Sequence, residues 1–303
     1  MSQAKPRTWT TRALLAWMAG AFEKKGLDSP RLCAELLVSH VLGCERLKLY
    51  MDPDRPATPI ERQTLRDLTT RALEHEPVQY LVGEAWFFGM PFKVDRRALI
   101  PRPATETIVE HVLQHARAQH ADLASADDLV IDMCTGSGCV TIAIAKNMPG
   151  ARVVATDISA EALELAQANA TRHNVSDRID FEQGDLFDAI DAHAAARAHA
   201  SAAYLVSNPP YIPDDEWAEV PPNVKDHEPE LALRGGNDGL DLVRTIFNRG
   251  PQHLQQGGLV LVEIAETKAD EARALAEANE LLTDVKVLDD FEGRPRVVRA
   301  RRA

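Results

Sequence analysis

The chain has 303 residues, which is enough for two domains or for one large α/β domain with an extension. Hydrophobic residues make up 45% and charged residues 26%, as is normal for a globular protein with a sizeable core. No apolar run approaches the roughly 20 residues that span a bilayer, and the N-terminus lacks a secretory signal, so we expect a cytoplasmic protein with no membrane partner. The net charge of -12 argues against a phosphate backbone as the main partner and favours a basic protein or a small molecule.

The four cysteines are Cys33, Cys44, Cys134 and Cys139. They form no CxxC pair, and no histidine cluster has the spacing of a zinc site. We therefore expect reduced thiols in a reducing compartment and no metal site.

Residues 1–80 are expected to form a small helical domain. Apolar side chains recur there at helical spacing, as at Leu14, Leu15, Met18 and Phe22. Ser29 and Pro30 predict the start of a second helix, with Ser29 as its cap. Thr58 and Glu61 predict a capping box at the start of a third helix, which Pro77 ends. This region carries no catalytic constellation of its own.

Residues 81–103 are expected to be a linker. Aromatic and apolar residues flank Gly89 and Pro91, which predicts a short hairpin within residues 84–95. Pro101 and Pro103 stiffen the chain and prevent a helix until about Ala104.

Residues 104–303 alternate between strand and helix patterns, which predicts an α/β domain with a parallel sheet. The alanine-rich stretch 191–203 carries little information and is expected to be a surface excursion. The predicted strands are 129–131, 152–156, 179–181, 204–207, 259–264, 285–288 and 295–300, and the helices between the first three are 140–146 and 160–173.

A glycine-rich loop follows the first predicted strand directly. Its candidate cofactor-binding residues are Asp132, Cys134, Thr135, Gly136, Ser137 and Gly138. Glycine lets a ligand approach the backbone, and ligands of open α/β sheets bind at the carboxyl ends of strands. A dinucleotide fingerprint would need glycine at Thr141, and no GK[ST] follows, so neither this fingerprint nor a Walker loop is present. A tight structural turn is the alternative reading.

The next two strands also end in polar groups. Asp157 can accept both hydroxyls of a ribose, with Ile158 beside it, although a helix-capping role is an alternative. Asp185 and Leu186 follow the third strand and suit an adenine amine and the adenine ring. Three successive strand ends therefore predict a nucleoside site whose ligand lacks a pyrophosphate.

The fourth strand ends in Asn208, Pro209, Pro210 and Tyr211, the candidate catalytic and substrate-binding residues. Two prolines fix the backbone, so the Asn208 side-chain oxygen and the Pro209 carbonyl can face one point. Two acceptors suit an NH₂ group, whose nitrogen lone pair they can direct at a sulfonium methyl. The Tyr211 ring would pack against a planar acceptor and form one wall of its site. A rigid turn is the alternative.

These motifs in this order resemble class I S-adenosylmethionine-dependent methyltransferases that methylate amino groups. The fuller resemblance is to bacterial protein-glutamine methyltransferases of the HemK-like family. It extends over about residues 30–300 and includes EPVQYLVGEAWFFGMPFKV, LIPRPATE, DHEPELAL and GGNDGLD. The resemblance implies a seven-stranded class I methyltransferase domain, a helical N-terminal domain that recruits a protein substrate, and a glutamine acceptor.

The family has a release-factor branch and a ribosomal-protein branch. Cys134 stands where the release-factor form usually has glycine, but the RPATE and EPELAL motifs favour release factors, whose glutamine lies in a Gly-Gly-Gln loop. We therefore expect peptide chain release factors as partners, with a ribosomal protein as the alternative. Arg102 and Glu106 are candidates for the pocket mouth, or form only a rim salt bridge. A nucleic-acid amino methyltransferase and a non-catalytic assembly factor stay open as other classes.

Overall fold

The computed structural model describes residues 8–197 and 201–303 and divides the chain into two compact units. The first contains the chain up to Gly83 together with Pro222–His227, and the second contains Glu84–Pro221 and Glu228–Ala303. Residues 222–227 thus group with the helical unit, although the sequence analysis included them in residues 104–303. Within the described ranges, no helix is long and apolar enough to cross a bilayer.

The first unit is a bundle of helices around one apolar core. The capping box is confirmed, because the Glu61 N–H donates to the Thr58 hydroxyl and the Thr58 N–H donates to the Glu61 carboxylate. Helix α2 begins at Pro30 with Ser29 at its cap position, as expected, but Ser29 has a left-handed backbone (φ 48°) and its side chain makes no capping hydrogen bond. The third predicted helix ends at Leu73, ahead of Pro77. The helices are α1 (Thr11–Lys25), α2 (Pro30–Leu42), α3 (Lys48–Met51), α4 (Pro59–Leu73), α5 (Val78–Val82) and α10 (Pro222–Lys225).

The second unit contains a seven-stranded sheet in the order β5-β4-β3-β6-β7-β9-β8. Strands β5, β4, β3, β6 and β7 pair in parallel, and β9 is antiparallel to both β7 and β8. Chain order reverses between β3 and β6, so their carboxyl ends flank the crevice where open α/β sheets bind ligands. The strands are β3 (Leu129–Met133), β4 (Arg152–Asp157), β5 (Ile179–Gln183), β6 (Ala202–Ser207), β7 (Leu254–Glu263), β8 (Leu282–Asp289) and β9 (Pro295–Arg302).

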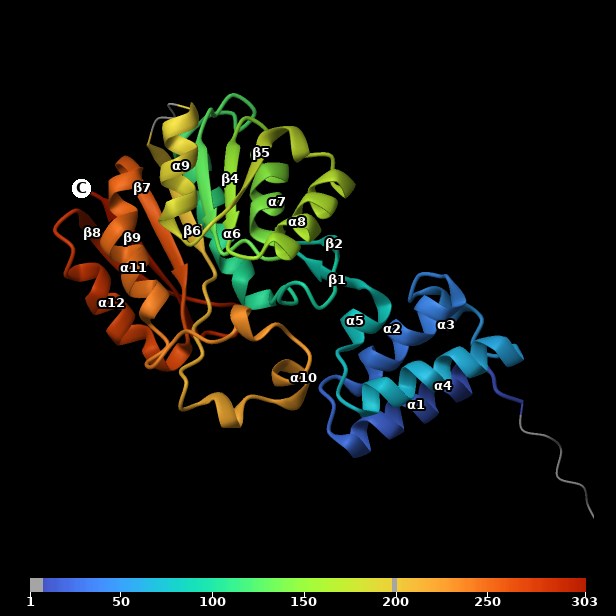
Figure 1. The fold of residues 1–303 in the computed structure, drawn as a ribbon. Coiled ribbons are helices and arrows are strands. Elements are labelled where there is room, and N and C mark those ends of the chain that lie inside the picture. Colours follow the sequence, from blue (N-terminus) through green and yellow to red (C-terminus); the bar gives the residue numbers. More distant parts are fainter. Residues whose placement is uncertain (1–7, 198–200) are drawn as a thin grey trace, which may run out of the picture. The chain divides into compact units, whose positions relative to one another are not determined.

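Helices cover both faces of this sheet (Figure 1). One core lies between the sheet and α6 (Glu106–Gln119), α7 (Cys139–Asn147) and α8 (Ala160–Arg172). The other lies between the sheet and α9 (Phe187–Arg197), α11 (Asp241–Arg249) and α12 (Ala269–Glu277). Strand β6 is buried along its whole length, which explains its continuous apolar sequence. The expected seven-stranded α/β fold is confirmed, with five parallel strands and an antiparallel pair, β9 and β8, at one edge.

The segment between the bundle and the sheet contains the expected hairpin, formed by β1 (Glu84–Phe87) and β2 (Met90–Lys93). Helix α6 begins at Glu106, soon after the two prolines, and had no predicted counterpart. The expected surface excursion at 191–203 was wrong where the structure describes it, since α9 continues to Arg197 and β6 begins at the buried Ala202. Alanine suits both an exposed helix and a buried strand, so this composition did not distinguish them. Residues 198–200 lie outside the described residues.

Candidate active site

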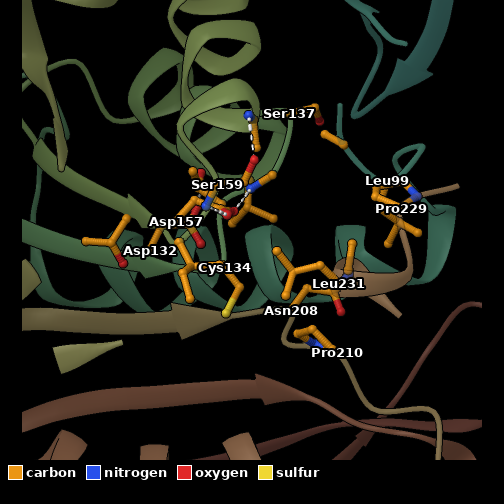
Figure 2. A pocket seen from close by; sticks show the side chains of 18 of the residues that line it. Leu99, Asp132, Cys134, Ser137, Asp157, Ser159, Asn208, Pro210, Pro229 and Leu231 are labelled. Atoms are coloured by element: carbon orange, nitrogen blue, oxygen red, sulfur yellow. Dashed lines mark hydrogen bonds between the residues drawn. The ribbon is translucent and has the colours of Figure 1, made fainter. Parts of the chain in front are cut away.

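A cavity of about 270 Å³ opens at the carboxyl ends of β3, β4, β5 and β6, within the second unit (Figure 2). These parallel strands bring together groups that are up to about 75 residues apart along the chain. The predicted site residues that line the cavity are Arg102, Asp132, Cys134, Thr135, Gly136, Ser137, Asp157, Ile158, Asp185, Leu186, Asn208 and Pro210.

Four predicted site residues lie outside this lining. Gly138 begins α7 with φ 78°, and a Cβ there would lie 3.0 Å from the Cβ of Ala166, so it serves helix packing. Glu106 accepts the Phe88 N–H at 2.8 Å, which directs its carboxylate to the β1–β2 turn. Pro209 is buried, and the Tyr211 hydroxyl donates to Glu263 at 3.2 Å.

The buried carboxyl of Asp132 organises the glycine-rich loop. The hydroxyls of Thr135 and Thr141 both donate to its Oδ2, at 2.8 and 2.5 Å. Burial raises the pKa of Asp132 to about 6, although these two hydroxyls act in the opposite direction. The backbone is left-handed at Cys134 (φ 58°) and at Gly136 (φ 54°), so the loop turns sharply around the cavity.

Asp157 lies at the end of β4 with each carboxyl oxygen already accepting one backbone N–H. These bonds come from Gly136 and Ser159, both at 2.9 Å. The cap of α8 is Ser159, whose hydroxyl accepts the Ala162 N–H, so the capping alternative for Asp157 was wrong. Burial raises the pKa of Asp157. A carboxylate oxygen has two acceptor positions, so both oxygens can still take a hydroxyl from a ligand.

The other side of the cavity carries Asn208 and Pro210, as Figure 2 shows. The Asn208 Nδ2 donates to the hydroxyl of the buried Thr105 at 3.2 Å. This contact uses the amide nitrogen and leaves Oδ1 as an acceptor for a ligand. Among the described residues, no group of His, Cys, Asp or Glu side chains has the arrangement of a metal site.

The backbone of residues 208–211 is supported from behind by the segment 233–239. Ile212 donates to the Leu233 carbonyl and accepts from the Gly235 N–H, both at 2.9 Å. A Cβ at Gly235 would lie 2.7 Å from the Pro210 carbonyl oxygen and the Tyr211 Cα. Only glycine fits this spacing, which explains Gly235, the first glycine of the GGNDGL motif.

Two buried side chains that support the cavity, Glu228 and Asn169, were not among the predicted site residues. Glu228 is buried and accepts the Ile100 N–H at 3.0 Å and the Arg102 guanidinium at 2.5 Å. Arg102 therefore lies in the lining and also in an ion pair. Asn169 is fully buried in α8 and donates to the carbonyls of Ser137 and Lys93. The EPELAL motif contained Glu228, whereas Asn169 had no signal in the sequence.

Comparisons with known proteins agree with this geometry. Residues 13–83 match the PrmC N-terminal domain, and residues 130–227 match a methyltransferase domain. The release factor glutamine methyltransferase of Chlorobaculum tepidum is 41% identical over 94% of this chain and 95% of its own, and that of Rhodopirellula baltica is 36% identical over 97% of each. The hMettl16 catalytic domain, solved with an RNA hairpin, is 16% identical with a TM-score of 0.52 over 71% of this chain and 76% of its own, which shows the fold alone. The chain therefore has a class I methyltransferase fold and belongs to the family of release factor glutamine methyltransferases.

Proposed function

We propose that the protein transfers a methyl group from S-adenosylmethionine to the side-chain amide nitrogen of a glutamine in a peptide chain release factor. The observation that carries this proposal is the orientation of Asn208. Its nitrogen is engaged by Thr105, so its oxygen is the group available to a planar NH₂ in the cavity. The family membership supports a glutamine in a release factor as the source of that NH₂.

The cofactor is proposed to bind along the ends of β3, β4 and β5. The residues present fit it: Asp157 has spare acceptor positions for the ribose hydroxyls, and Asp185 and Leu186 line the same cavity for the adenine. Gly136 and Ser137 bring the backbone close to the ligand. When bound, the cofactor supplies an electrophilic methyl group on a sulfonium.

The acceptor amide is proposed to donate its two N–H protons to the Asn208 Oδ1 and to the Pro209 carbonyl. These bonds hold the NH₂ and favour the geometry in which the nitrogen lone pair points at the methyl carbon. Methyl transfer to the held nitrogen would leave it with an extra and far more acidic N–H proton, which would then pass to solvent. The protein thus contributes positioning and fixed dipoles rather than a strong base.

The helical unit is proposed to recruit the release factor, as the match to a family-specific N-terminal domain supports. The four cysteines are all unpaired, which supports a reducing compartment such as the cytoplasm. The boundaries 1–80, 81–103 and 104–303 remain our proposal for the division of roles along the chain.

The proposal is tested by methyl transfer from labelled S-adenosylmethionine to a purified release factor, with its loop glutamine replaced in a control. A ribosomal protein and total RNA serve as competing acceptors. We expect label on the release factor and none on its glutamine-replaced form. Label on RNA or on the ribosomal protein alone would contradict the proposal, and no binding of S-adenosylmethionine in calorimetry would point to a non-catalytic role.

A further inference from the structure

Asn169 in α8 is a fully buried amide whose oxygen and nitrogen both form hydrogen bonds. Its Oδ1 accepts the Lys93 N–H at 2.8 Å, and its Nδ2 donates to the Lys93 carbonyl at 3.0 Å. The second Nδ2 proton goes to the Ser137 carbonyl at 2.9 Å. One side chain therefore joins strand β2 of the hairpin to the glycine-rich loop, although Lys93 and Ser137 lie 76 and 32 residues from it in the chain.

These three bonds fix the orientation of the Asn169 amide and require asparagine. A rotated amide would place its oxygen against the carbonyls of Lys93 and Ser137 and its NH₂ against the Lys93 N–H, so all three bonds would be lost. An ionised aspartate would accept from Lys93 but could donate to neither carbonyl. Leucine has a similar size but would make none of the three bonds.

The glycine-rich loop needs support at Ser137. This residue lies between Gly136 (φ 54°) and Gly138 (φ 78°), and glycine leaves the backbone more freedom than any other residue. Ser137 is 2% exposed, so loss of the Asn169 bond would leave a buried carbonyl without this partner, which is unfavourable. Gly138 also packs closely on Ala166, which lies one turn before Asn169 on the same face of α8. Helix α8 therefore holds the loop by packing at one residue and by a hydrogen bond at the next turn.

The loop lines the cavity, whereas Asn169 lies outside that lining. We infer that Asn169 is a positioning residue for the cofactor: it holds the Ser137 carbonyl and thereby keeps residues 136–138 in the conformation that binds S-adenosylmethionine. A loop that is already held in its binding conformation loses less conformational entropy when the ligand binds. The inference rests on the proposed function in one respect, which is that this loop contacts the cofactor.

The test is calorimetric titration of S-adenosylmethionine, without an acceptor, into three variants of the full-length protein. Asn169→Leu and Asn169→Asp both lose the bond to Ser137, so each should raise the cofactor Kd by about 10-fold or more. The matched control is His173→Phe. The His173 Nε2 lies 2.9 Å from the Pro91 carbonyl oxygen, so it joins the same helix to the same strand without contacting the loop, and its ring lies against Phe92. Phenylalanine keeps the ring and loses this bond, so the Kd should stay within about 3-fold of wild type.

A purely structural role for Asn169 would lower thermal stability without a selective change in cofactor affinity. With a release factor as acceptor, the Asn169 variants should keep kcat at saturating cofactor and acceptor KM within about 3-fold of wild type, because the acceptor side is unchanged. A Kd within about 3-fold of wild type in both Asn169 variants would overturn the inference. An equal rise of the Kd in His173→Phe, or a loss confined to kcat, would also overturn it.

A measurement on the wild-type protein decides the question if the Asn169 variants fail to fold, as judged by circular dichroism. With ¹⁵N-labelled asparagine, both protons of the Asn169 NH₂ should exchange slowly with water, because both are buried and hydrogen-bonded. Their signals should shift when S-adenosylmethionine is added, and signals that stayed unchanged would overturn the inference. If the wild-type protein methylated no release factor, the proposed function would fail, while the cofactor affinities and this spectrum would still decide the role of Asn169.

Discussion

The two sides of the cavity are built from different kinds of contact. On the proposed cofactor side, Asp157 and Asp132 accept bonds from groups of the same or the adjacent strand-to-helix loop and from Thr141 in the first turn of α7. On the acceptor side, Asn208 and Tyr211 depend on Thr105 and Glu263, which are 103 and 52 residues away. The contacts of Asp157 and Asp132 thus join residues at most 21 positions apart in the chain, whereas those on the acceptor side join residues 52 and 103 positions apart.

This difference matches the chemistry of the two ligands. A nucleoside offers several hydroxyl and amine groups, so local carboxylates and N–H groups suffice to bind it. A single amide offers one NH₂ that must be aligned with a methyl group, and errors in its position lower the rate directly. We expect changes on the acceptor side to affect turnover and changes on the cofactor side to affect affinity.

The largest expected effect is that of Asn208→Ala on turnover. Under the proposed function the variant removes an acceptor for the reacting NH₂, so kcat should fall by about 100- to 1,000-fold, as for loss of a preorganised polar group elsewhere. Single-turnover methyl transfer at saturating cofactor measures it. A fall in kcat of less than about 3-fold would contradict the assignment of Asn208 to the acceptor side.

Gly239→Ala tests the support behind the acceptor side. A Cβ at Gly239 (φ 76°) would collide with the Tyr211 carbonyl oxygen, so we expect a loss of about 3 kcal/mol in the free energy of unfolding and a slower reaction. Gly257 is the matched control, since it has φ 80° and no atom within 4 Å of the added Cβ. Gly257→Ala should cost about 1 kcal/mol from backbone strain alone, measured by urea unfolding. Equal losses of unfolding free energy in the two variants would contradict a close contact between Gly239 and the Tyr211 backbone.

Asp157→Ala should weaken S-adenosylmethionine binding by about 30-fold, because hydrogen bonds to a charged group contribute about 1.5–3 kcal/mol. Thr58→Ala is the control, since it removes the cap of α4 in the helical unit and should lower stability by about 1 kcal/mol with little effect on affinity. Calorimetric titration and thermal melting separate the two. A Thr58→Ala variant with the larger loss of affinity would contradict the assignment.

The smallest expected effect is the pH dependence of stability from Glu263. Its folded-state pKa of about 6 lies above the ordinary value of 4.5, so ionisation is less favourable in the folded protein. Its contribution to stability is therefore full below pH 4.5 and is lost as pH rises through 6, by about 2 kcal/mol. Glu263→Gln lacks this loss, so its stability relative to wild type should rise with pH in urea unfolding. If the difference in unfolding free energy between Glu263→Gln and wild type did not change with pH, the raised pKa of Glu263 would be contradicted.

The sequence predicted the cofactor side of this cavity better than the acceptor side. The loop 132–138, Asp157 and Asp185 follow strands directly, and the carboxyl ends of parallel strands meet at one edge, so their grouping followed from strand prediction. Asn208 and Pro210 were found for the same reason. Thr105, Asn169 and Glu263 were not, because their roles depend on side chains that are distant in the sequence and meet only in the folded protein.

In the fold, too, features set by local sequence were predicted better than features that depend on distant residues. The sheet strands were predicted from short apolar runs between polar loops, and the capping box at Thr58 from local side-chain chemistry. The Ser-Pro pair predicted the start of α2 correctly, but it did not indicate that Ser29 adopts a left-handed backbone and makes no side-chain capping bond. Tyr211 was expected to face the acceptor, but its hydroxyl donates to a buried carboxyl that no local pattern indicated.

The most direct test of the division into two sides is the affinity of S-adenosylmethionine for Asn208→Ala and Asp157→Ala, measured side by side by calorimetry. We expect Asn208→Ala to bind the cofactor within about 3-fold of wild type despite its loss of turnover, and Asp157→Ala to bind it about 30-fold more weakly. If the affinity of Asn208→Ala instead falls in parallel with its rate, the cavity does not have separate cofactor and acceptor sides.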